Sequence, residues 1–132
     1  MPSKVRLQRI ADRLRQDLSE MLVMGRVNDP RLAGVNVTDV SIDRELAYAE
    51  IYVSAVEGAE RAKEVIAAFE HASGFIRHEL AAQIDLRSFP RLRFHWDPTP
   101  EKADRIERLL LTLHTDETQA EPEVEDDEVD EA

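Results

Sequence analysis

The sequence predicts an α+β domain with the order helix, strand, strand, helix, kink, helix, strand, helix. Two patterns support this prediction. In three segments apolar residues recur at steps of three and four, which is typical of helices with one buried face. In three shorter segments apolar and polar residues alternate, which is typical of half-buried strands. A length of 132 residues fits one small folded domain.

Residues 3–24 form the first predicted helix. Ser3 can cap its start and Gly25 can end it. At 100° per residue, Arg6, Arg9 and Arg13 fall within about 60° of one another beside the apolar stripe. They form an exposed basic edge, which suits either phosphate binding or an ordinary solvated helix face. The stripe itself comprises Leu7, Ile10, Leu14, Leu18, Met21 and Leu22.

The next two elements are predicted strands, residues 35–43 and 46–56. The short link at residues 43–45 favours pairing as a hairpin. The apolar phase of the first strand slips, which indicates a bulge near Thr38–Asp39 or burial on both faces.

Residues 58–84 have a helical period interrupted by Ala72, Ser73 and Gly74. Because glycine is disfavoured inside a helix by about 1 kcal/mol, we expect a kink or a full break there. A helix beginning at Gly74 would direct backbone N–H groups at a phosphate, with Arg77 in its first turn. The alternative is that the small residues allow close helix packing.

Residues 91–96 form a third predicted strand with one apolar and one basic face. It belongs to an acid-free run, residues 87–95, that contains Arg87, Arg91 and Arg93. Phosphate binding is a natural use for such a run.

Tyr48 and Tyr52 share the polar face of the second strand. They suit base stacking or simple coverage of the sheet.

The acidic charge is concentrated at the C-terminal end. The chain has 17 Lys+Arg and 28 Asp+Glu, for a net charge of −11. Ten acids and no Lys or Arg lie in residues 116–132, which leaves 17 basic and 18 acidic residues before them. We therefore predict a folded body over residues 1–114, closed by a helix over 101–114, and a disordered acidic tail over 115–132.

Several functional classes are disfavoured. The chain has no Cys, which excludes disulfides, Cys-ligated metal sites and thiol nucleophiles. No apolar run reaches 18 residues and the N-terminus does not read as a signal peptide, so we expect a cytoplasmic protein without membrane contact. The four histidines form no ligand-spaced motif, and no nucleotide-binding or nucleophile motif occurs. We expect no enzyme activity, no metal and no cofactor.

Short motifs in a specific order resemble the bacterial ribosome-binding factor A family over about residues 6–113. They are Arg9-Ile10-Ala11, Asp29-Pro30-Arg31-Leu32, Val37-Thr38-Asp39-Val40, Leu46-Ala47-Tyr48-Ala49, Ile51-Tyr52-Val53, Ala72-Ser73-Gly74-Phe75-Ile76-Arg77, Leu86-Arg87 and Pro90-Arg91-Leu92-Arg93-Phe94.

The resemblance implies a type II KH-like fold in which a helical kink replaces the usual Gly-x-x-Gly loop. It implies binding to free or immature 30S subunits and 16S ribosomal RNA, and a role in late 30S maturation and rRNA processing. We expect a monomer that binds RNA through the basic positions and the kink. These candidate residues are Arg6, Arg9, Arg13, Ser73, Gly74, Arg77, Arg87, Arg91 and Arg93. The alternative function is a protein-interaction adaptor that docks a basic partner through the acidic tail and the sheet.

Overall fold

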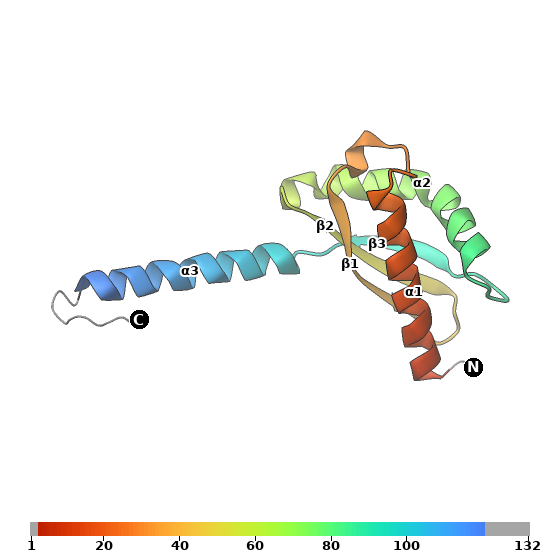
Figure 1. The fold of residues 1–132 in the computed structure, drawn as a ribbon, viewed down its shortest axis with the longest axis horizontal. Helices are drawn as coiled ribbons and strands as arrows, with labels where there is room; N and C mark the ends of the chain where they lie inside the picture. The colour runs from red at the N-terminus through yellow and green to blue at the C-terminus, as the bar shows by residue number, and fades with distance from the viewer. Residues whose placement is uncertain (1–2, 121–132) are drawn as a thin grey trace. The chain divides into compact units, whose positions relative to one another are not determined.

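The computed structural model describes residues 3–120, and the side chains of residues 3–114. The chain divides into two compact units, Met1–Pro98 and Thr99–Ala132. Within the described residues the elements are α1 (Lys4–Val23), β1 (Val35–Ile42), β2 (Tyr48–Ala55), α2 (Ala62–Gln83), β3 (Arg91–Trp96) and α3 (Thr99–Ala120), with 3-10 turns at Pro30–Leu32 and Ala59–Arg61. The predicted α+β class and element order are confirmed (Figure 1).

Helix α1 begins and ends as its sequence predicts. The Ser3 hydroxyl accepts a hydrogen bond from the Arg6 backbone N–H at 3.1 Å, which caps the first turn. Gly25 follows the last turn with φ of 69°, a backbone conformation that glycine adopts without steric cost. Between these ends Leu14 and Leu18 are fully buried, so one stripe of the helix joins the core.

The sheet has the order β1-β2-β3. β1 and β2 pair antiparallel as a hairpin, and their register shifts between Val37 and Asp39, which confirms the predicted bulge. β3 pairs parallel to β2. A parallel neighbour requires a long crossover connection, and α2 supplies it.

One face of the sheet is covered and the other is open. On β2, Ala49, Ile51 and Val53 are completely buried, whereas Tyr48, Glu50 and Tyr52 on the other face are only half-buried. α1 packs on β1 and α2 packs on β3, where the Phe69 and Phe94 rings stack with centroids 4.6 Å apart. Both helices therefore cover the same face, and the core lies between them and the sheet.

Of the two alternatives predicted at residues 72–74, a kink or a full break, the full break does not occur, because α2 is a continuous 22-residue helix. Its axis nevertheless changes direction part-way along (Figure 1). Ser73 and Gly74 lie near the middle of α2, and such pairs are a known cause of helix bends. The kink is thus present without loss of the helix.

Helix α3 forms the second unit and extends to Ala120, beyond His114, where the sequence predicts the helix to end. An apolar set on α3 is exposed: Ile106, Leu109, Leu110, Leu111 and Leu113. The predicted acidic tail falls largely outside the described residues. None of the helices described between residues 3 and 120 has the length and apolar character needed to cross a membrane.

Candidate nucleic-acid interface

A groove of about 330 Å³ runs along one flank of α1, and we call it the α1 groove. Its lining residues are Arg6, Arg9, Ile10, Arg13, Ile84, Asp85 and Leu86. The three arginines come from successive turns of α1, and the facing wall is the chain that leaves α2. All three are exposed, as the sequence predicts. The sequence could not show that residues 84–86 complete the groove, because that wall lies far away along the chain.

The arginines of the α1 groove differ in their partners. Arg13 forms an ion pair with Asp17 at 3.0 Å and donates to the Gln83 carbonyl oxygen at 3.2 Å. It therefore ties α1 to the end of α2. Arg6 and Arg9 form no ion pair with any side chain that the structure describes. Their charge is available to an anionic ligand, although Asp85 offsets part of it.

The β3 surface is less basic than the sequence predicts. β2 places Glu50 directly beside Arg93, with Arg93 Nε 3.0 Å from one carboxylate oxygen and His95 Nε2 2.6 Å from the other. The guanidinium holds the pKa of Glu50 below its usual range, and His95 adds to this effect. In turn, Glu50 raises the pKa of Arg93. The run over residues 87–95 therefore lacks acids only along the chain, because the sheet pairs Arg93 with Glu50 from the neighbouring strand.

Two tyrosines cover this part of the open sheet face. The Arg93 guanidinium lies 3.8 Å from the centroid of the Tyr48 ring, and the Tyr52 ring stacks on His95 with centroids 5.1 Å apart. Contacts of this kind fix the rings against the sheet. The interpretation of the tyrosines as sheet coverage accounts for these contacts.

Ser73 lines a small cavity of about 250 Å³ between α2 and β3, together with Glu70, Leu92, Arg93, Phe94 and His95. Gly74 does not begin a helix, because α2 continues through it. Gly74 is not closely packed either, since a Cβ atom built there meets no described atom within 4 Å. Ala72, in contrast, packs against the core. Gly74 therefore presents open backbone to the surroundings.

Arg77 has a structural task that the sequence did not reveal. Its guanidinium donates to the carbonyl oxygens of Phe89 at 2.7 Å and Pro90 at 3.1 Å. These bonds hold the loop before β3 against α2. Its predicted role in RNA binding stays a prediction.

Arg87 and Arg91 are exposed and form no ion pair within the described part of the chain. Arg87 is the next residue in the chain after Leu86, which lines the α1 groove. Arg91 starts β3 opposite Tyr48. The predicted residues thus fall into two groups, one at the α1 groove and one at the β3 surface.

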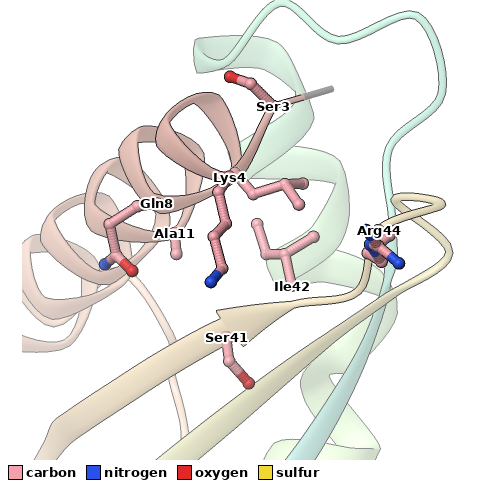
Figure 2. Close-up of a pocket in the computed structure, with 8 residues that line it drawn as sticks. Ser3, Lys4, Gln8, Ala11, Ser41, Ile42 and Arg44 are labelled. Atoms are coloured by element: carbon pink, nitrogen blue, oxygen red, sulfur yellow. The ribbon is translucent and has the colours of Figure 1, made fainter. Parts of the chain in front are cut away.

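Sequence reasoning missed Lys4 and Arg44. They line a larger cavity, on the opposite flank of α1 (Figure 2). The only indication of this second site in the sequence was the position of Lys4 on the helical wheel, on the side of the helix away from Arg6, Arg9 and Arg13. Among the described residues no group of three His, Cys, Asp or Glu side chains is placed to hold a metal ion.

The fold and site define a class of protein, a type II KH-like domain. Its first helix carries arginines that form no ion pair with the described side chains. Comparison with known proteins makes the class specific. Residues 6–110 match the family model described as ribosome-binding factor A. The chain belongs to the ribosome-binding factor A family.

Individual relatives agree with the family match. The ribosome-binding factor A of Alcanivorax borkumensis is 36% identical over 93% of this chain and 88% of the relative. That of Chromohalobacter salexigens is 38% identical over 80% of this chain and 81% of the relative. The crystal structure of ribosome-binding factor A from Thermus thermophilus superposes with a TM-score of 0.58 at 25% identity, covering 67% of this chain and 93% of that one.

Proposed function

We propose that this protein binds free or immature 30S subunits through 16S ribosomal RNA and assists late 30S maturation and rRNA processing. Its relatives are named ribosome-binding factor A, which states that they bind the ribosome. The observation that carries the proposal is the α1 groove, where exposed Arg6 and Arg9 have no acidic partner in the described part of the chain. Unpaired arginines on a concave surface suit phosphodiester contacts.

The groove favours RNA over a protein partner because its charge is arranged in a row. Arg6 and Arg9 are one helical turn apart, and both line the groove. Successive phosphates of a nucleic-acid strand present charge in the same repeating way. Arg13 contributes by holding the two walls together, through its bond to the Gln83 carbonyl.

The β3 surface is a secondary contact in this proposal. Arg91 is exposed, and the open backbone at Gly74 allows an RNA strand to approach α2 closely. Arg93 reaches phosphate only when its bond to Glu50 is exchanged. The role is one of binding without catalysis, by a cytoplasmic monomer.

Sedimentation of a cell lysate tests the function. The protein should migrate with free and immature 30S particles and be scarce on 70S ribosomes. Deletion of its gene should cause precursor 16S rRNA to accumulate. Recovery only at the top of the gradient, together with normal 16S rRNA in the deletion strain, would contradict the proposal.

A further inference from the structure

A cavity lies between the first half of α1 and the end of the β1–β2 hairpin. It measures about 750 Å³ and is lined by Ser3, Lys4, Leu7, Gln8, Ala11, Ser41, Ile42 and Arg44. Figure 2 shows Lys4 extending from α1 toward β1 and Ile42 pointing up toward the helix, with Arg44 at the hairpin turn. This size falls within the range of ligand-binding sites in proteins.

The cavity combines two cations with an apolar floor. Lys4 and Arg44 come from different elements and form no ion pair with the described side chains. No acid is among the lining residues. The Asp43 carboxylate, next to Arg44 in the chain, accepts the backbone N–H groups of Ala47 at 2.7 Å and Tyr48 at 3.0 Å through one of its oxygens.

The floor is formed by Leu7, Ala11 and Ile42. Ala11 is buried, and Leu7 and Ile42 are half-buried, so part of each larger side chain remains open to a ligand. A ligand that is complementary to this cavity has an anionic group that contacts the two cations and a flat apolar part that packs on the floor. A nucleotide has both, in its phosphate and its base.

The cavity and the proposed RNA contact lie on opposite flanks of the same part of α1. At 100° per residue, its α1 residues lie about half a turn from those of the α1 groove, so the two sites flank the same buried stripe. An RNA strand that lies over the exposed end of α1 meets both. The position of both sites on the same helix favours RNA over an acidic peptide, which the charges alone would also accept.

We propose that this cavity binds one unpaired nucleotide of the bound RNA. Lys4 and Arg44 hold its phosphate, and Leu7 and Ile42 support its base. A paired base cannot enter, because its partner strand blocks access to the floor. The inference rests on the proposed function, since it names a further site on the same RNA.

Fluorescence anisotropy with a single-stranded ten-nucleotide RNA and a duplex of the same sequence tests the site. The double variant Lys4→Ala/Arg44→Ala removes both charges. Its matched control, Lys63→Ala/Arg105→Ala, removes one exposed Lys and one exposed Arg that do not line the cavity. Gln8→Trp fills the cavity from its exposed rim and leaves the charge unchanged. Thermal unfolding checks that each variant is folded.

We expect the double variant to lower the slope of log affinity against log salt concentration for single-stranded RNA by about 0.7, because the one phosphate held by the two cations is no longer neutralised. Gln8→Trp should weaken the binding of single-stranded RNA at least fivefold and the binding of duplex RNA less than twofold. The control variant should change the affinity for single-stranded RNA and for duplex RNA by the same factor. Equal affinity of Gln8→Trp and the unaltered protein for single-stranded RNA would overturn the inference.

Two competition experiments distinguish an RNA nucleotide from a free nucleotide and from an acidic peptide as the ligand. Uridine monophosphate should fail to displace the RNA at millimolar concentration, and displacement would assign the site to free nucleotides instead. A poly-glutamate peptide should displace RNA from the unaltered protein no better than from Gln8→Trp. Stronger displacement from the unaltered protein would assign the site to an acidic peptide. If the unaltered protein binds neither RNA nor 30S particles, the proposed function itself is wrong.

Discussion

Glu50 and Arg93 face each other across the parallel β2–β3 pair, with Arg93 Nε 3.0 Å from a carboxylate oxygen of Glu50. The ion pair neutralises the cation that the sequence places at the centre of the basic strand. The same carboxylate also forms a hydrogen bond with His95, so Glu50 contacts both of these side chains. RNA binding at the β3 surface therefore competes with an internal contact.

Glu50→Gln should increase the affinity for RNA. The variant removes the charge that holds Arg93, which makes the guanidinium available to phosphate. The salt slope of binding should steepen by up to about 0.7–0.9, the value for one additional phosphate contact. The measurement is RNA affinity at several salt concentrations. An unchanged slope would exclude Arg93 from the interface.

The same pair predicts a pH dependence of stability. The pKa of Glu50 is lowered in the folded protein from its usual 4.5, chiefly by the Arg93 hydrogen bond. The unfolded chain therefore takes up the proton first as pH falls, so the contribution of Glu50 is complete above the unfolded pKa and is lost as pH drops through the folded pKa.

The difference in unfolding free energy between the unaltered protein and Glu50→Gln should therefore shrink between about pH 5 and about pH 3. Urea titrations across this range measure it. A difference that is constant with pH would show that the ion pair does not form in solution.

Arg77→Ala should destabilise the fold by about 1–3 kcal/mol, because the carbonyl oxygens of Phe89 and Pro90 lose their donors. Arg77→Lys keeps the charge but not the two-pronged geometry, and should recover only part of the loss. Urea unfolding measures both variants. If Arg77→Ala lowers RNA affinity without lowering stability, the residue acts in binding alone.

Gly74→Ala separates a structural role from a binding role. A Cβ atom at this position meets open space, so replacing glycine inside α2 should stabilise the protein by about 0.5–1 kcal/mol. If RNA approaches the backbone here, affinity should fall while stability rises. Thermal unfolding and RNA titration together provide the test. Unchanged affinity would remove Gly74 from the contact surface.

Local features of the fold could be predicted from the sequence because they depend on neighbouring residues. The Ser3 cap, the bulge between Val37 and Asp39 and the alternation on β2 are all of this kind. Of the kink and the break that the sequence allowed in α2, the break does not occur because a glycine costs only about 1 kcal/mol in a helix. The buried Phe69 and Ile76 on either side more than offset that cost.

The parts of the site that could not be predicted depend on contacts between distant segments. Glu50 and Arg93 are 43 positions apart, and only the parallel pairing of β2 with β3 brings them together. Arg44 reaches the cavity beside Lys4 only because the hairpin turn lies near the start of α1. Residue type alone indicated a basic protein surface but not which cations are paired.

The most direct test of the account is binding of purified 30S subunits by an Arg6→Glu/Arg9→Glu variant, measured by co-sedimentation. The control is Arg15→Glu/Lys63→Glu, which reverses two exposed cations that do not line the α1 groove. The account predicts that the groove variant stays folded and binds at least about tenfold more weakly than the control, with a reduced salt slope. Equal binding by the two variants would contradict the claim that the α1 groove contacts ribosomal RNA.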